Sequence, residues 1–235
     1  MRPLICAHRG HCGVKGLSAS ERYRRAIDLG VDFIEFDVRR TGDGAYVSYH
    51  EPQTPSGRAL SEISQAEFSS ELGRKALGID ELLEIAKGRV GLHVDLKEVG
   101  YETEIVRRLR ADCDESKFVI TSLEDVSIRT IKDSFPTVQV GLSLGRDLTR
   151  ASVWQRISVR ASELFPDRRL KACGADFVAV HKRLATLRVL DYCAAKKVPA
   201  WVWTLEDELE IARFWSDPRV AVVITDRPDL AVSRA

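Results

Sequence analysis

Residues 32–38, Asp-Phe-Ile-Glu-Phe-Asp-Val, form a short apolar run in which two carboxylates alternate with apolar side chains. Because the side chains of a β-strand point alternately to the two faces of a sheet, Glu35 and Asp37 would share one face. The apolar side chains between them would share the other face, where helices would cover them. The stretch therefore predicts a buried strand whose inner face carries two carboxylates.

Seven further apolar runs resemble this one, and stretches with helical spacing lie between the runs. The strand candidates are Leu4–Ala7, Asp32–Val38 (with a hairpin-like extension at Tyr46–Tyr49), Val90–Leu96, Phe118–Thr121, Val138–Leu142, Asp176–Val180, Ala200–Thr204 and Val220–Thr225. The helix candidates are Ser20–Leu29, Ile79–Ala86, Glu102–Leu109, Glu124–Ser134, Ala151–Leu164, Leu184–Lys196 and Glu206–Trp215.

Eight strands that alternate with helices in 235 residues predict an α/β protein with parallel strands closed into a (β/α)₈ TIM-type barrel. An open doubly wound sheet is the alternative. That fold usually carries G-x-G-x-x-G after its first strand, and the motif is absent here. The spacing Ser18–Glu21 predicts a capping box at the start of the first helix.

No linker interrupts this pattern, so we expect residues 1–235 to form a single domain. Residues 51–76, after the second strand, are polar and show little periodicity. We interpret them as a short insertion and a candidate lid. Residues 145–174 contain a helix with Trp154 and Ile157 among many basic side chains. These arginines and lysines could form a phosphate- or membrane-steering patch, but a solvated helix face is the favoured interpretation.

Composition excludes several classes of partner and of site. The formal net charge is +1, so no global field favours nucleic acid or an anionic membrane. No apolar stretch approaches the length needed to span a bilayer, and the first residues lack a secretory signal. The five cysteines include no C-x-x-C pair, which argues against a disulfide framework and a zinc site. We therefore expect a cytoplasmic protein without a stable membrane anchor.

The histidines lie in informative places. His8 and His50 each stand at the end of a predicted β segment, His181 follows the sixth strand, and His11 lies in the loop after the first. His93 lies within the third strand. In a β/α barrel the carboxyl ends of the strands build the active site, so the clustering favours a functional role.

The third strand adds a further carboxylate. In residues 92–97 the alternation turns His93, Asp95 and Lys97 inward together. Glu35, Asp37 and Asp95 then make an oxygen-rich site that suits a hard cation such as Mg²⁺ or Ca²⁺. Ion pairing with basic side chains is the alternative. Lys97 could neutralise one carboxylate or bind a phosphate beside the metal.

Two histidines beside a divalent cation suit phosphoryl chemistry. The cation would polarise the non-bridging oxygens and offset the developing negative charge. One histidine could deprotonate the attacking hydroxyl and the other could protonate the leaving alkoxide. Arg9, next to His8, could hold a phosphate oxygen with its forked donors.

The same residues match a known family in its order along nearly the whole chain. The matching segments are His8-Arg9-Gly10, Gly30–Val38, Thr41-Gly42-Asp43-Gly44, His50, Asp95-Leu96-Lys97, Trp201–Thr204 and Ile224–Asp229. Together they resemble the signature of glycerophosphodiester phosphodiesterases.

This resemblance implies a TIM-type barrel that hydrolyses a small-molecule glycerophosphodiester to sn-glycerol 3-phosphate and an alcohol. It implies His8 and His50 as the catalytic pair, and one divalent cation on Glu35, Asp37 and Asp95. The expected substrate and phosphate contacts are Arg9, Lys97, His181 and Trp203. Asp226 looks like part of the structural closure of the last strand, so no chemistry is expected of it.

The sequence departs from the family pattern in four places. Leu17-Ser18-Ala19 replaces the usual Glu-Asn-Thr, Asp95 replaces a glutamate, Glu51 replaces an aspartate, and the insertion after His50 is short. Two other functions therefore stay open. One is a phospholipase-D-like transferase that forms a cyclic phosphate, and the other is a barrel that binds phosphodiesters without cleaving them.

Overall fold

The structure is a computed structural model and describes residues 2–235. Its centre is a closed barrel of eight parallel strands, with β1 hydrogen-bonded to both β9 and β2. The strands are β1 (Leu4–Ala7), β2 (Phe33–Arg40), β4 (Gly91–Leu96), β5 (Phe118–Ser122), β6 (Gln139–Leu144), β7 (Phe177–His181), β8 (Ala200–Leu205) and β9 (Val220–Thr225). The predicted barrel is thus confirmed, and the open sheet is excluded by the β1–β2 pairing.

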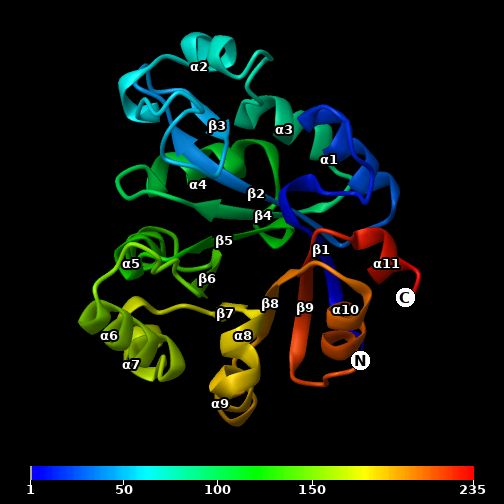
Figure 1. The fold of residues 1–235 in the computed structure, drawn as a ribbon, viewed down its shortest axis with the longest axis vertical. Helices are drawn as coiled ribbons and strands as arrows, with labels where there is room; N and C mark the ends of the chain where they lie inside the picture. The colour runs from blue at the N-terminus through cyan, green and yellow to red at the C-terminus, as the bar shows by residue number, and fades with distance from the viewer. Residues whose placement is uncertain (1) are drawn as a thin grey trace.

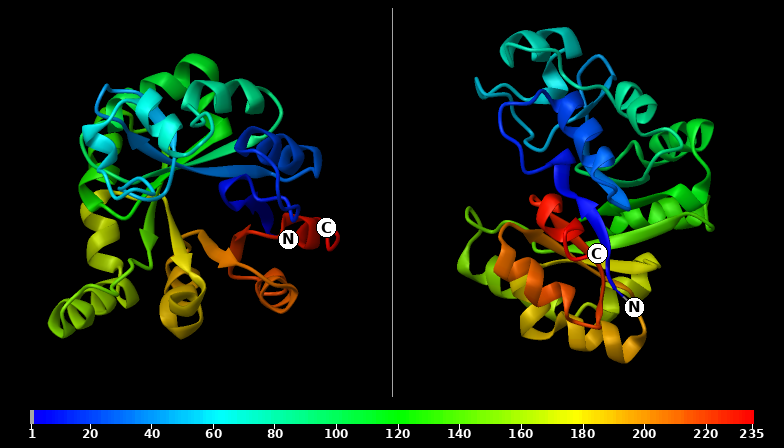
Figure 2. Two further views of the ribbon diagram at one scale, coloured as in Figure 1. Left: turned by 45° about the horizontal axis from the view of Figure 1, so that its top comes forward. Right: turned by 90° about the vertical axis from the view of Figure 1, so that its right-hand side faces the viewer.

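Helices surround the barrel, and the two termini lie near each other at one side (Figure 1 and Figure 2). The helices are α1 (Ala19–Asp28), α2 (Gln65–Glu71), α3 (Ile79–Ala86), α4 (Glu102–Asp112), α5 (Asp125–Ser134), α6 (Val153–Leu164), α7 (Asp167–Cys173), α8 (Lys182–Leu184), α9 (Leu190–Lys196), α10 (Glu208–Trp215) and α11 (Pro228–Val232). Three short 3₁₀ turns are η1 (His8–Gly10), η2 (Leu60–Glu62) and η3 (Glu115–Lys117), and η4 (Ala185–Val189) is a π-turn.

The core lies between the barrel and the helices. Ile34, Phe36 and Val38 of β2 point outward into it and are fully buried, as the alternation in residues 32–38 predicts. A smaller apolar cluster fills the barrel interior, where the rings of Phe177 and Trp201 stack with centroids 4.8 Å apart. A glycine is required opposite this stack, because a Cβ at Gly141 would lie 2.3 Å from the Phe177 ring. The polar site therefore lies above a closed apolar floor.

The segment 51–76 is more ordered than its weak periodicity predicts. It contains η2 and α2, and β3 (Tyr46–Ser48) precedes it, antiparallel to β2. Leu60, Ile63 and Phe68 form a separate small core with Val47. These apolar residues are spaced irregularly, so the sequence pattern hid them, and the insertion packs on itself above the barrel (Figure 1).

Most predicted boundaries agree with the structure within a few residues, and the capping box of Ser18 and Glu21 is present. The helix predicted at Leu184–Lys196 starts earlier and includes the π-turn η4. Three short helices, α2, α7 and α11, are missing from the prediction because five to seven residues give too little periodicity. Within residues 2–235, no helix is both long and apolar enough to cross a membrane.

Candidate active site

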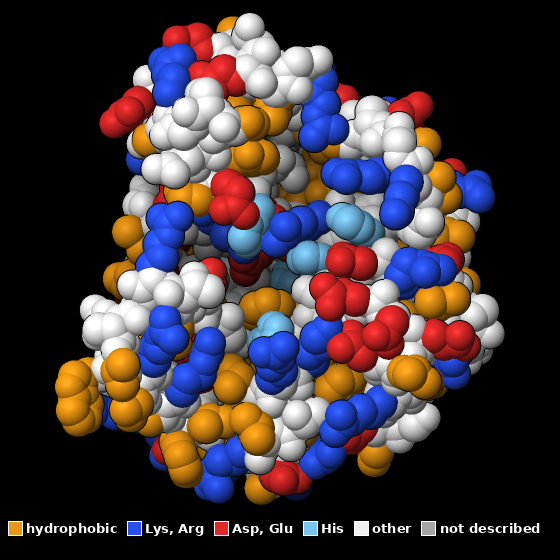
Figure 3. All heavy atoms as spheres, viewed as in Figure 1, with side chains coloured by type: hydrophobic (Ala, Val, Ile, Leu, Met, Phe, Trp, Pro, Cys, Tyr) orange, Lys and Arg blue, Asp and Glu red, His pale blue; other side chains and the backbone are white. Residues whose placement is uncertain are grey.

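A cavity of about 1010 Å³ opens at the carboxyl ends of the barrel strands. Figure 3 shows this hollow near the centre of the molecule, with histidine, acidic and basic side chains around it. All nine residues predicted from the sequence for the site line it: His8, Arg9, Glu35, Asp37, His50, Asp95, Lys97, His181 and Trp203. The fold thus gathers into one cavity residues that are scattered along the sequence.

The loop after β1 places Arg9 across the two carboxylates of β2. Arg9 and Gly10 both adopt left-handed backbone conformations, with φ of 51° and 63°. A Cβ at position 10 would lie 2.5 Å from the ring of Tyr23, so only glycine fits there. The turn directs the Arg9 amide to Oε2 of Glu35 at 2.8 Å and brings Nε within 3.0 Å of Oδ2 of Asp37. A left-handed non-glycine residue at such a place is costly and is commonly found at functional sites.

His8 is held by an aspartate that the sequence interpretation left out of the chemistry. Nδ1 of His8 lies 2.6 Å from Oδ1 of Asp226, at the end of β9, and Nδ1 of His11 lies 3.7 Å from the same oxygen. Burial alone would raise the pKa of Asp226, but the hydrogen bond to His8 and the charges of His8 and His11 lower it. A charged Asp226 fixes the ring of His8, and within residues 2–235 Nε2 of His8 has no hydrogen-bond partner.

His50 is held in the same way by its neighbour. Its Nδ1 lies 2.6 Å from Oε1 of Glu51, and its carbonyl accepts a 2.8 Å hydrogen bond from Nε of Arg39. Burial, and then the charge of Lys97, lower the pKa of His50 below 6.5, although Asp37 and Glu51 oppose the change. His50 is therefore neutral at pH 7 and able to accept a proton.

Lys97 links the carboxylates of the two central strands. Its Nζ lies 2.7 Å from Oδ1 of Asp37 and 2.5 Å from Oδ2 of Asp95. The hydroxyl of Thr121 donates to Oδ1 of Asp95 at 2.5 Å and fixes this side chain from β5. Both interpretations of Lys97 stay compatible with this position, because an ammonium that neutralises two carboxylates also faces the cavity.

The donor set of Glu35, Asp37 and Asp95 suits a hard cation by its chemistry. Burial, and next the charge of Asp37, raise the pKa of Glu35, so this group lacks sufficient positive charge nearby. In this structure Lys97 lies between two of the carboxylates. Among residues 2–235, no three His, Cys, Asp or Glu side chains already enclose a position for an ion. A bound cation would thus have to share these carboxylates with Lys97.

The far wall of the cavity is built on a buried glutamate. Glu163 of α6 is 1% exposed, and its Oε1 accepts hydrogen bonds from the amides of Gly145 and Arg146, each at 2.8 Å. Its Oε2 pairs with Arg160. Gly145 in turn lies against His181 and Trp203, whose rings meet edge to face at 5.2 Å between centroids. This wall, with Arg160 and Glu163, was not identified from the sequence, because side chains of α6 and of the loop after β6 meet only in the fold.

Two other histidines, His93 and His11, are not placed to exchange a proton with a ligand in the cavity. His93 lines the cavity, but its Nε2 lies 2.8 Å from the Thr121 hydroxyl, and burial lowers the pKa of His93 to about 4. It therefore remains neutral and supports Thr121 under Asp95. His11 does not line the cavity, and its nearest acidic partner is Asp226.

Comparisons with known proteins find one family and one fold. Residues 8–77 match the model of the glycerophosphoryl diester phosphodiesterase family. A glycerophosphodiester phosphodiesterase of Caldanaerobacter subterraneus subsp. tengcongensis is 26% identical over 162 residues, which cover 60% of this chain and 67% of that protein. The matched segment 8–77 includes His8, Arg9, Glu35, Asp37 and His50.

Two solved structures have the same fold. A glycerophosphodiester phosphodiesterase from Parabacteroides distasonis has a TM-score of 0.80 at 19% identity, covering 99% of this chain and 96% of that one. A phosphodiesterase from Oleispira antarctica, solved with the product sn-glycerol 3-phosphate, has a TM-score of 0.75 at 18% identity, covering 99% and 96%. The chain is thus similar to the glycerophosphoryl diester phosphodiesterase family over residues 8–77, and it shares its barrel with the two solved phosphodiesterases along nearly its whole length.

Proposed function

We propose that this chain is a metal-dependent phosphodiesterase that hydrolyses glycerophosphodiesters to sn-glycerol 3-phosphate and an alcohol, with His8 and His50 as its acid–base pair. One observation carries the proposal. Both histidines line one cavity, and each is held through Nδ1 by a carboxylate, which leaves Nε2 for the substrate. Three carboxylates and two basic side chains lie beside them in that cavity. The relative from Oleispira antarctica, solved with sn-glycerol 3-phosphate, supports the class of product.

The two histidines have different surroundings, which divides the roles between them. His50 has a lowered pKa and is neutral at pH 7, so we assign it the acceptance of a proton from the water molecule that attacks phosphorus. His8, oriented by Asp226, would give its proton to the leaving oxygen as the phosphorus–oxygen bond breaks. Arg9 and Lys97 would bind the non-bridging oxygens. One proton thus enters the site from the nucleophile and one leaves with the alcohol.

Glu35, Asp37 and Asp95 would hold one divalent cation, Mg²⁺ or Ca²⁺. When bound, such a cation supplies positive charge for the phosphoryl oxygens. The protein residues position its ligands. The Arg9 amide orients Glu35, the Arg9 guanidinium orients Asp37, and Thr121 orients Asp95. Asp95 is one methylene shorter than the usual family glutamate, and Thr121 holds it in place.

The remaining cavity would receive the two organic parts of the diester. Trp203 and His181 form one side of the cavity with Gly145, and we assign them to contact with the glycerol or alcohol group. Leu184 and Leu187 extend this wall toward the cavity mouth. The proposed partner is thus a small-molecule phosphodiester.

The test uses a bis-aryl phosphate that releases a coloured alcohol, assayed with Mg²⁺ or Ca²⁺. The wild-type protein should turn it over, and His8→Ala and His50→Ala should each lower kcat by about 10²–10⁴ while remaining folded. His11→Ala is the matched control, because His11 also lies near Asp226 but does not line the cavity. Equal losses in all three variants would overturn the assignment of the pair.

A further inference from the structure

The first half of helix α6 stands clear of the rest of the protein. Residues 152–158 are all exposed, and Glu163 is the single buried residue among the twelve of α6. Its apolar side chains Val153, Trp154 and Ile157 therefore contact solvent, with Trp154 80% exposed. A helix of a globular protein normally buries its apolar side chains against the core. Val153, Trp154 and Ile157 instead remain exposed, whereas Leu164 at the end of α6 packs against the core.

These apolar residues are accompanied by basic residues that no acid neutralises. Arg150, Arg156, Arg183 and Arg188 are exposed, and none forms an ion pair in the part of the chain that the structure describes. The Arg156 guanidinium donates only to the backbone carbonyls of Thr149 and Ala151. The first turn of α6 carries no acidic side chain, although the helix dipole favours acids there. The four arginines thus leave positive charge on this surface that no acidic side chain pairs within the described residues.

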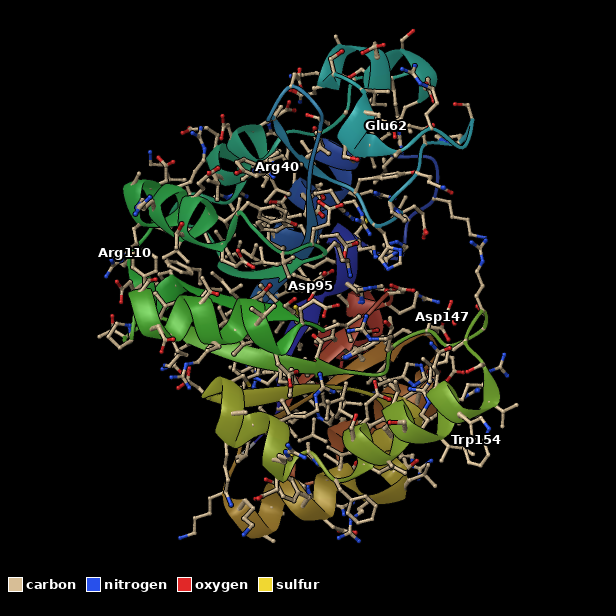
Figure 4. All side chains as sticks on the ribbon, turned by 90° about the vertical axis from the view of Figure 1, so that its left-hand side faces the viewer. Arg40, Glu62, Asp95, Arg110, Asp147 and Trp154 are labelled. Atoms are coloured by element: carbon tan, nitrogen blue, oxygen red, sulfur yellow. The ribbon has the colours of Figure 1, made fainter. Side chains whose placement is uncertain are left out.

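This surface borders the mouth of the active-site cavity. Leu187, 69% exposed, and Arg183 belong both to the surface and to the cavity lining. Helix α6 packs against the π-turn that carries Leu187. Figure 4 shows Trp154 projecting on the same side as Asp147, which lines the cavity, and Figure 3 shows apolar atoms protruding at lower left, where α6 lies. We call the surface formed by Val153, Trp154, Ile157, Leu187 and the four arginines the α6 rim.

We propose that the α6 rim docks on an anionic phospholipid surface, which brings the cavity mouth to phosphodiesters at that surface. A few protruding apolar side chains among basic ones match the boundary between acyl chains and anionic headgroups. Tryptophan prefers that boundary because it has an apolar body and a polar edge. A second copy of this chain does not fit as the occupant, because two identical basic faces would repel each other.

The experiment measures sedimentation of the full chain with vesicles of phosphatidylcholine alone, and of phosphatidylcholine mixed with phosphatidylglycerol. The wild type should bind the mixed vesicles, bind the neutral ones more weakly, and lose affinity as salt is added. Trp154→Ala combined with Ile157→Ala should lower the partition coefficient about tenfold or more. Arg150→Gln and Arg156→Gln should each lower it about fivefold.

Leu209→Ala is the matched control. Leu209 lies on α10, is 83% exposed, and is not part of the α6 rim, so its loss should leave vesicle binding unchanged. Trp154→Phe gives a second measurement. Mixed vesicles should shift the tryptophan emission of the wild type to shorter wavelength, and this shift should disappear in Trp154→Phe although binding persists. These assays require no turnover, so their outcome is independent of the phosphodiesterase proposal.

Three outcomes would overturn the docking proposal. The wild type could fail to bind vesicles that contain phosphatidylglycerol, and a protein would then be the better candidate for the partner. Leu209→Ala could weaken binding as much as the double variant does. The emission shift could survive in Trp154→Phe, which would place the membrane contact elsewhere on the chain.

Discussion

Oδ1 of Asp226 lies 2.6 Å from Nδ1 of His8, so a hydrogen bond joins the end of the last strand to the loop after the first. The two residues are 218 positions apart and meet only because β1 and β9 are neighbours in the closed barrel. Closure of the barrel thus completes the candidate catalytic pair. A histidine held by a carboxylate has a fixed orientation and a fixed position of its proton.

Asp226→Asn should therefore lower kcat by about 10²–10⁴ with a small change in KM, because His8 would lose its charged partner while the shape of the site persists. Steady-state kinetics with a soluble diester measure both constants. Asp217→Asn is the control, since Asp217 pairs with Arg219 before β9 begins, at the opposite end of that strand. Unchanged kcat in Asp226→Asn would show that His8 acts without this aspartate.

The acid limb of the kcat/KM profile should lie below pH 6.5. The neutral form of His50 accepts the proton, and a lowered pKa keeps that form populated to lower pH. The hydrogen bond to Glu51 raises the pKa of His50, so Glu51→Gln should move the acid limb to still lower pH. Glu71→Gln, at the end of α2, should leave the profile unchanged. A limb above pH 6.5, or one that Glu51→Gln moves upward, would contradict the role given to His50.

Without the Lys97 ammonium between Asp37 and Asp95, the stability of the protein should depend on added metal. Lys97→Met leaves Asp95 without a cationic partner and Asp37 with Arg9 alone, which should lower the free energy of unfolding by about 3–5 kcal/mol. Adding Mg²⁺ or Ca²⁺ should then raise the melting temperature of this variant more than that of the wild type. Thermal unfolding with and without the metals measures the difference.

The control for this prediction is Lys132→Met. Lys132 also pairs with a half-buried aspartate, Asp176, but no other carboxylate lies in that pair. The Lys132→Met variant should be less stable than the wild type, and added metal should not restore its stability. Equal responses of the two variants to metal would argue against a cation site at Glu35, Asp37 and Asp95.

Truncation of Glu163 to alanine should destabilise the protein more than its replacement by the isosteric glutamine. Glu163→Ala leaves the amides of Gly145 and Arg146 without their acceptor, which should cost about 2–4 kcal/mol in the free energy of unfolding. Glu163→Gln keeps an acceptor and should cost less. Urea unfolding measures both, and KM should rise in the alanine variant because the wall loosens. Equal stability of the two variants would contradict this account.

The barrel could be predicted from the sequence because each strand is short, apolar and followed by a helical pattern. Residues 32–38 show this well, since the alternation there correctly separates the cavity-facing carboxylates from the buried Phe36. Short elements such as α7 and α11 could not be predicted, because they contain too few residues for a helical period. The small core around Phe68 in the insertion lacks a regular period altogether.

The part of the candidate site that strand alternation and barrel topology determine could be predicted from the sequence. Strand alternation places Glu35 beside Asp37, and barrel topology places His8 near His50. Contacts between distant segments could not be predicted in this way. Asp226 meets His8, and Glu163 supports Gly145, only after the chain has closed. The exposure of Trp154 likewise follows from what the fold leaves uncovered.

The most direct test is to measure, by phosphorus NMR, the products that the wild-type protein forms from a glycerophosphodiester with Mg²⁺ or Ca²⁺ and again after chelation by EDTA. The account predicts metal-dependent appearance of sn-glycerol 3-phosphate and no turnover with EDTA. Formation of a cyclic phosphate would contradict the hydrolytic reaction. Unchanged turnover in EDTA would contradict the metal requirement, and no turnover across a panel of diesters and metals would contradict the proposed function as a whole.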